Sequence, residues 1–260
     1  MNVHALQYCI HWEDKPANFS HVRALLEELR PQPGDLVVLP ELSCLGFTMR
    51  REGLAEQPEG ETSKFFAGLA SEHEIYLLGG ASWWGENELG RNMALTFDPR
   101  GELLGVYAKQ HPFSYGGETD HYQPGQDFFQ FDWHGCKVAP LICYDLRFPE
   151  TFRHLACRGT EFYVVIANWP AARVHHWDAL LMARAIENQA YVLGVNRCGE
   201  DPRVNYPGST RLIDPHGKVV AHLDQQPGHL SARLDVEDLR AYRTRFPALN
   251  DLKRSQLGLA

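Results

Sequence analysis

The sequence predicts a layered α/β protein. Short apolar segments typical of strands alternate along the chain with amphipathic helical segments, and several strands are joined by turns short enough for hairpins. No linker divides the 260 residues, so we expect a single domain over residues 1–260. Two sheets packed face to face with helices outside fit the number of strands. Periodicity alone does not separate this arrangement from one large mixed sheet.

The N-terminal segments already show this alternation. Residues 3–10 are an expected strand, and apolar residues over 19–29 recur at helical spacing, with Asp14 or Asn18 available as the helix cap. The Pro-Gln-Pro-Gly run that follows ends this helix. Residues 36–39 are wholly apolar, which is typical of a strand covered on both faces.

The rest of the chain continues the pattern. Further strands are expected over residues 75–78, 93–97, 103–108, 128–133, 137–142, 162–167, 191–196, 209–213, 219–223 and 230–234. Further helices are expected over residues 61–72, 149–157, 176–189 and 236–243. Turn sequences at 98–101 and 134–135 predict two hairpins. The helix over 176–189 has the clearest apolar stripe.

Charge and motif content narrow the possible functions. The chain has 25 Lys and Arg against 33 Asp and Glu, a net charge of -8, which argues against a nucleic-acid or anionic-membrane partner. We find no membrane-spanning stretch and no signal peptide, so we expect a cytoplasmic protein with reduced cysteines. Metal-binding and nucleotide-binding motifs are absent, and we expect neither a metal nor an organic cofactor.

Three reactive residue types stand at the ends of apolar strands. Glu41 follows residues 36–40, Lys109 follows residues 103–108, and Cys143 follows residues 138–142. Ligand sites in α/β folds gather at the carboxyl ends of strands, so these side chains are candidates for one site. Taken alone, each is more typical of a solvated carboxylate, a surface lysine or an inert buried thiol, respectively. Their joint occurrence favours a site.

Together the three residues can fill complementary roles in one catalytic mechanism. A carboxylate such as Glu41 can accept a thiol proton and return it to a leaving amine. An ammonium such as Lys109 favours the thiolate of Cys143 and stabilises a developing oxyanion. The backbone N–H of Tyr144 is a natural second oxyanion donor, because it is adjacent to the sulfur. This is the chemistry of nucleophilic catalysis by cysteine.

The segments around these residues resemble the nitrilase superfamily of carbon–nitrogen hydrolases, in its order and spacing. The three signature segments are Leu39-Pro40-Glu41, Tyr107-Ala108-Lys109-Gln110-His111 and residues 142–150, Ile-Cys-Tyr-Asp-Leu-Arg-Phe-Pro-Glu. The resemblance extends downstream through residues 183–192 and 208–217. It implies a Glu–Lys–Cys triad in a four-layer α-β-β-α sandwich that pairs into homodimers. It also implies a second glutamate that holds the lysine, for which Glu118 is the match; a plain loop carboxylate is the alternative.

Residues 145–150 and 167–171 look most like the omega-amidase branch, which hydrolyses the terminal amide of small 2-oxo dicarboxylic acid monoamides. Such an amide substrate carries a carboxylate, for which Arg147 and Arg173 are the candidate partners. A salt bridge from Arg147 to Glu150 and solvent exposure of Arg173 are the alternatives. Three aromatic residues near the signature segments could either shape the pocket or pack in the core: Phe47, Phe113 and Trp169.

Other functions remain open at this point. A nitrilase or an N-carbamoyl amino-acid hydrolase would use the same triad with a different pocket. Outside the enzymes, the chain could be a non-catalytic sandwich that binds a protein partner. An interface has no need for Glu41, Lys109 and Cys143 together, which favours an enzyme.

Overall fold

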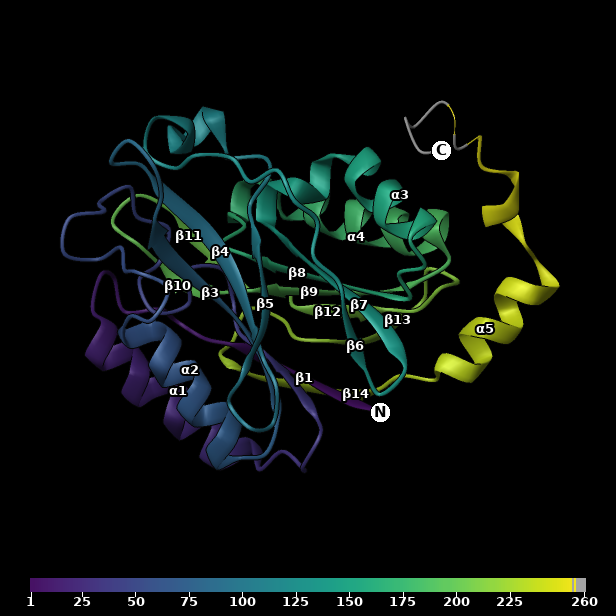
Figure 1. Ribbon diagram of the computed structural model, residues 1–260, viewed down its shortest axis with the longest axis horizontal. Coiled ribbons are helices and arrows are strands. Elements are labelled where there is room, and N and C mark those ends of the chain that lie inside the picture. Colours follow the sequence, from purple (N-terminus) through teal and green to yellow (C-terminus); the bar gives the residue numbers. More distant parts are fainter. Residues whose placement is uncertain (254, 256–260) are drawn as a thin grey trace.

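Two six-stranded mixed sheets pack face to face in the computed structural model, which describes residues 1–253 and 255 (Figure 1). The strands of the first sheet are, in spatial order, β14 (Gly228–Arg233), β1 (Asn2–Gln7), β2 (Leu36–Val38), β3 (Tyr76–Trp84), β4 (Gly90–Phe97) and β5 (Leu103–Ala108). Those of the second are β13 (Val219–His222), β12 (Arg211–Ile213), β9 (Tyr191–Asn196), β8 (Phe162–Ala167), β7 (Cys136–Ile142) and β6 (Phe131–Trp133). A separate small ribbon consists of β10 (Cys198–Glu200) and β11 (Asn205–Pro207).

Helices cover the outer face of each sheet (Figure 1). The first sheet carries α1 (Lys15–Leu29) and α2 (Glu61–Glu72), and the second carries α3 (Pro149–Cys157) and α4 (Val174–Asn188). A further helix, α5 (Val236–Arg245), lies at the edge of this arrangement. The order helix, sheet, sheet, helix is the expected α-β-β-α sandwich, and the alternative of one large mixed sheet is wrong.

The wholly apolar strand β2 shows why the sequence folds in this way. Leu36 and Val38 belong to the cluster that fills the space between the two sheets, whereas Val37 belongs to the cluster under α1 and α2. All three side chains are fully buried. Because successive side chains of a strand point to opposite faces, a strand between two layers needs apolar residues at every position.

Several element boundaries differ from those expected. The strand expected over residues 209–213 begins only at Arg211, because Gly208 and Ser209 have φ of 66° and 64°. The strand expected over residues 128–133 is limited to β6, whereas β3 extends well past residue 78. Of the two cap candidates for α1, Asp14 is the cap, and its carboxylate accepts the N–H of Ala17 at 3.0 Å.

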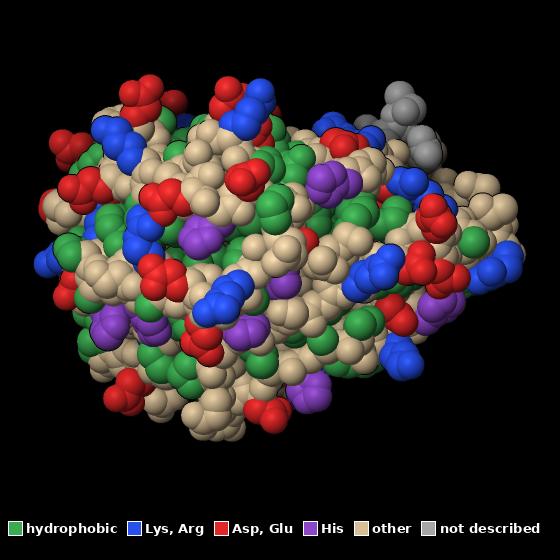
Figure 2. Space-filling view, turned by 90° about the horizontal axis from the view of Figure 1, so that it is seen from below, with side chains coloured by type: hydrophobic (Ala, Val, Ile, Leu, Met, Phe, Trp, Pro, Cys, Tyr) green, Lys and Arg blue, Asp and Glu red, His purple; other side chains and the backbone are tan. Residues whose placement is uncertain are grey.

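Parallel strands occupy the centre of both sheets. In the first sheet β2 is parallel to both β1 and β3, and in the second β8 is parallel to both β7 and β9. The carboxyl ends of β2, β7 and β8 lead into the loops that carry the candidate residues. Over the face seen in Figure 2, acidic and basic side chains are interspersed. Within the part of the chain that the structure describes, no helix is both long and apolar enough to cross a membrane.

Candidate active site

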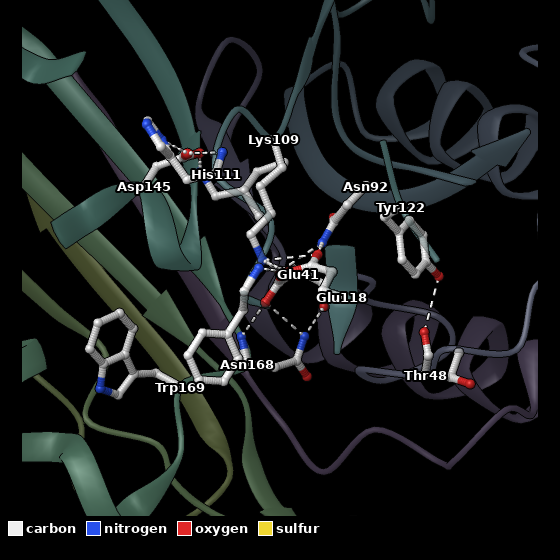
Figure 3. A network of polar contacts seen from close by, with 12 residues as sticks. Glu41, Thr48, Asn92, Lys109, His111, Glu118, Tyr122, Asp145, Asn168 and Trp169 are labelled. Atoms are coloured by element: carbon white, nitrogen blue, oxygen red, sulfur yellow. Dashed lines mark hydrogen bonds and ion pairs between the residues drawn. The ribbon is translucent and has the colours of Figure 1, made fainter. Parts of the chain in front are cut away.

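The side chain of Lys109 lies between two buried carboxylates (Figure 3). Its Nζ is 2.8 Å from Oε1 of Glu41 and 2.8 Å and 3.1 Å from the two carboxylate oxygens of Glu118. All three residues are at most 1% exposed. Buried charges are tolerated only where they are paired and hydrogen-bonded. The surrounding fold must therefore hold these three charged groups in contact with one another.

Backbone geometry brings Glu41 and Lys109 to the same place. Glu41 follows β2, and the chain then turns through Leu42, which has φ of 43°. A Cβ on Gly80 of β3 would lie 2.3 Å from the nitrogen of Leu42, so only glycine lets the turn pass this close. Lys109 follows β5, and its N–H donates to the carbonyl of Asn92 at 2.9 Å. The carboxyl end of β5 therefore stays attached to β4.

Two asparagines that are not among the predicted site residues hold these carboxylates (Figure 3). Nδ2 of Asn92 donates to Glu41 at 2.8 Å and to Glu118 at 2.9 Å, so one amide bridges both carboxylates. The backbone N–H of Asn168 donates to the other oxygen of Glu41 at 2.8 Å. Asn168 follows β8, in the second sheet, so the carboxylate of Glu41 also connects the two sheets.

Glu118 is not a plain loop carboxylate. It opens the short 3-10 turn η2 (Glu118–Asp120), directly after Gly117, whose φ is 76°. Its carboxylate also accepts the backbone N–H of Phe113 at 2.5 Å. This loop therefore folds around Glu118 and directs the carboxylate toward Lys109.

Cys143 lies where β7 passes into the 3-10 turn η3 (Cys143–Arg147). Its φ of 48° is a left-handed conformation that non-glycine residues rarely adopt. The fully buried carboxylate of Asp145 holds this turn by accepting the N–H of Ile142 at 3.0 Å, the hydroxyl of Tyr107 at 2.8 Å and the N–H of His111 at 3.0 Å. These contacts link the cysteine turn to the segment that carries Lys109.

The electrostatics of the site keep Lys109 charged and Cys143 protonated at rest. Burial alone lowers the pKa of Lys109, but Glu118 and Glu41 outweigh it and hold the pKa well above its usual value. Burial and the Glu41 carboxylate raise the pKa of the Cys143 thiol, and Lys109 opposes them only in part. Burial, opposed by Lys109, also raises the pKa of Glu118. Lys109 therefore favours the thiolate as expected, but burial and the Glu41 carboxylate outweigh its effect on the pKa of Cys143.

A cavity of about 870 Å³ opens onto Cys143. All five predicted pocket residues line it: Phe47, Phe113, Arg147, Trp169 and Arg173. Tyr144, the predicted oxyanion donor, lines it as well. The ring of Phe47 lies 5.3 Å from Nζ of Lys109, and the guanidinium of Arg147 lies 4.9 Å from the ring of Trp169. The three aromatic residues therefore shape the pocket, although Trp169, at 2% exposed, also packs against Trp177.

Four arginines line this cavity: Arg50, Arg147, Arg173 and Arg203. The two predicted ones, Arg147 and Arg173, lack carboxylate partners among the residues that the structure describes. Arg147 donates to Nδ1 of His176 at 3.1 Å, and the alternative salt bridge to Glu150 is not formed. The guanidinium of Arg173 lies 5.3 Å from the ring of Phe113, and its side chain is only partly exposed. Guanidinium groups held beside aromatic rings remain free to bind a carboxylate of a ligand.

Comparison with known proteins identifies the family of this chain. Residues 2–244 match the carbon–nitrogen hydrolase family. The chain is 40% identical to the omega-amidase YafV of Yersinia enterocolitica, over 95% of this chain and 94% of that protein. It is 29% identical to the 2-oxoglutaramate amidase of Bacillus subtilis over 97% of both chains. A solved CN-hydrolase superfamily protein from Xanthomonas campestris, described with an arsenic adduct in its active site, superposes with a TM-score of 0.90 at 32% identity over 97% of both chains. The chain therefore belongs to the carbon–nitrogen hydrolase family of the nitrilase superfamily.

Proposed function

We propose that this hydrolase cleaves the terminal amide of 2-oxo dicarboxylic acid monoamides, such as 2-oxoglutaramate and 2-oxosuccinamate, to the acid and ammonia. One observation carries the proposal: the cavity above Cys143 also holds Arg147 and Arg173, which have no carboxylate partner in the described part of the chain. A substrate that has an amide at one end and a carboxylate at the other fits this pair of features. The names of the relatives in Yersinia and Bacillus support the same substrate class.

In the proposed first half-reaction, Cys143 attacks the amide carbon while Glu41 takes the thiol proton. The oxyanion that forms is stabilised by the ammonium of Lys109 and by the backbone N–H of Tyr144. Glu41 then gives its proton to the amide nitrogen, the carbon–nitrogen bond breaks, and ammonia leaves. The product of this step is a thioester between Cys143 and the acyl group.

The second half-reaction releases the acid. Glu41 takes a proton from water, and the resulting hydroxide adds to the thioester carbon. The carbon–sulfur bond then breaks, the acid leaves, and Glu41 returns its proton to the sulfur of Cys143. Glu118 positions Lys109 throughout, because its two carboxylate oxygens both accept from Nζ. Glu41 therefore carries every proton transfer that the proposed reaction needs.

A panel of four substrates tests the proposal. Ammonia release is measured from 2-oxosuccinamate, 2-oxoglutaramate, a simple nitrile and an N-carbamoyl amino acid. Turnover that is fastest for the two oxo-amides is the expected result. Activity confined to the nitrile or the carbamoyl compound would overturn the substrate class while leaving the carbon–nitrogen hydrolase in place.

Substitution of the two pocket arginines is expected to weaken turnover of anionic substrates selectively. Arg173→Gln and Arg147→Gln each remove one charged hydrogen-bond donor, and a lost charged hydrogen bond lowers kcat/KM about 10–100-fold. The same variants should change kcat/KM for a neutral aliphatic amide by less than about threefold, because that substrate has no carboxylate to bind. Steady-state kinetics on 2-oxosuccinamate and butyramide give the comparison.

Arg100→Gln is the matched control, because Arg100 lies on an exposed turn and is 73% exposed. It should leave kcat/KM unchanged for both substrates. Equal losses on the anionic and the neutral substrate would show that the pocket arginines are structural.

Asn92→Ala is expected to lower kcat about 10–100-fold with little change in KM, since the lost donor served both Glu41 and Glu118. Asn92→Asp should lower kcat further than Asn92→Ala does, because it adds a third carboxylate to the buried group. Kinetics with a melting curve for each variant separate this effect from unfolding. A larger KM at unchanged kcat would place Asn92 in substrate binding instead.

Two expectations about the whole protein stay predictions. The family resemblance implies a homodimer through the outer helices, and Met182 and Ile186 on α4 are 38% and 49% exposed, which supports such a contact. We also propose a cytoplasmic location, because all six cysteines are free thiols in the structure.

A further inference from the structure

Two cysteines outside the active site face each other. Sγ of Cys9 lies 3.7 Å from Sγ of Cys198, although the residues are 189 positions apart in the chain. Cys9 follows β1 of the first sheet, and Cys198 opens β10 directly after β9 of the second. The pair therefore lies where the two sheets meet.

Backbone pairing holds these two residues together. Cys9 and Cys198 form an isolated parallel bridge, and the N–H of Cys198 donates to the carbonyl of Tyr8 at 3.2 Å. Residues paired in this way have Cα atoms about 5 Å apart, within the range that a disulfide spans. The bond can therefore form without moving either strand far.

The two thiols differ in their access to solvent. Cys9 is exposed, whereas Cys198 is fully buried. Burial raises the pKa of the Cys198 thiol to about 12. A dissolved oxidant therefore meets Cys9 first, and Cys198 is held beside it as the second thiol.

We propose that Cys9 and Cys198 form an oxidation site that hydroperoxides convert into a disulfide. In the first step the sulfur of Cys9 attacks hydrogen peroxide, the O–O bond breaks, and a sulfenic acid and water form. In the second step the sulfur of Cys198 attacks the Cys9 sulfur, and the hydroxyl leaves with the Cys198 proton as another water. Two thiols and one peroxide thus give one disulfide and two waters.

The disulfide fastens the ribbon of β10 and β11 to the end of β1. The segment between these two strands belongs to the wall of the catalytic cavity, through Asp201, Pro202, Arg203 and Val204. Oxidation therefore restrains one wall of the cavity without using any residue of the catalytic group. The restraint closes a long loop and should stabilise the folded chain.

The test is carried out in the Cys143→Ala background, so that oxidation of the proposed nucleophile does not interfere. The folded protein is treated with hydrogen peroxide, unfolded, alkylated and digested with trypsin. We expect a cross-linked pair of peptides, residues 198–203 joined to residues 1–23, that reducing agent separates. We also expect the melting temperature to rise by about 5–10 °C and to return after reduction.

Three further variants in the same background decide the assignment. Cys9→Ser and Cys198→Ser should each abolish the cross-link and the rise in melting temperature. Cys157→Ser, which alters another partly exposed thiol, should leave both unchanged. Conversion of Cys9 to sulfinic or sulfonic acid with Cys198 still alkylatable would overturn the proposal, as would a cross-link between other cysteines. Because no step needs turnover, the result is independent of the substrate proposed above.

Discussion

Replacing Cys143 with alanine is expected to lower kcat by at least about 10⁴-fold on every amide that the enzyme accepts. In the proposed mechanism the substitution removes the sulfur that forms the thioester, and loss of a nucleophile that works with its base costs almost the whole rate enhancement. The fold should be preserved, because alanine is smaller than cysteine and is compatible with the buried turn. Ammonia release from 2-oxosuccinamate, measured at high enzyme concentration, gives the residual rate.

Cys157→Ala is the matched control. It removes a thiol from α3 that lies outside the cavity lining, and it should keep kcat within about twofold. A Cys143→Ala protein that folds but retains more than about 1% of wild-type kcat would show that another group performs the attack.

Replacing Lys109 with methionine is expected to destroy activity and also to destabilise the fold. The ammonium is the positive charge between the buried carboxylates of Glu41 and Glu118, with Nζ 2.8 Å from each. Removing one partner of a buried ion pair costs about 3–5 kcal/mol, which corresponds to a fall of roughly 6–20 °C in melting temperature for a chain of this size. Calorimetry and kinetics on the same preparation measure both effects.

The double variant Lys109→Met/Glu118→Gln separates the two roles of Lys109. It neutralises one of the uncompensated carboxylates, and so it should recover part of the lost melting temperature. Activity should stay absent, because the oxyanion still lacks its ammonium. Recovery of activity together with stability would mean that Lys109 serves only the fold.

The alternation of strands and helices predicted the class of fold, and the sandwich itself came from the resemblance of three short segments. The ribbon of β10 and β11 escaped prediction, because three residues such as Cys-Gly-Glu carry neither alternation nor β-branched side chains. Its position nevertheless decides one wall of the cavity. Short polar strands of this kind form only because their neighbours hold them.

The candidate site was predicted unevenly. Glu41, Lys109 and Cys143 stand at strand ends, which is a local signal, and the structure brings the first two within hydrogen-bond distance across 68 positions of sequence. Asn92 gave no such signal: the expected strand started one residue after it, so it looked like a loop residue. Its bridge between two carboxylates depends on packing that sequence periodicity does not contain. The catalytic roles and the single-domain boundary remain predictions.

Because of the contact between Asn168 and Glu41, enzymatic turnover can be used to follow the docking of the two sheets during folding. The carboxylate belongs to the first sheet, whereas its amide partner and the turn that carries Cys143 belong to the second. An intermediate in which only one sheet has formed, or in which the sheets have collapsed without docking, therefore has no complete catalytic group. During refolding, recovery of turnover should lag behind recovery of secondary structure by the time that docking of the sheets takes. Two inactive fragments, one ending after β5 and the other carrying the second sheet together with β14, should regain turnover only when they associate.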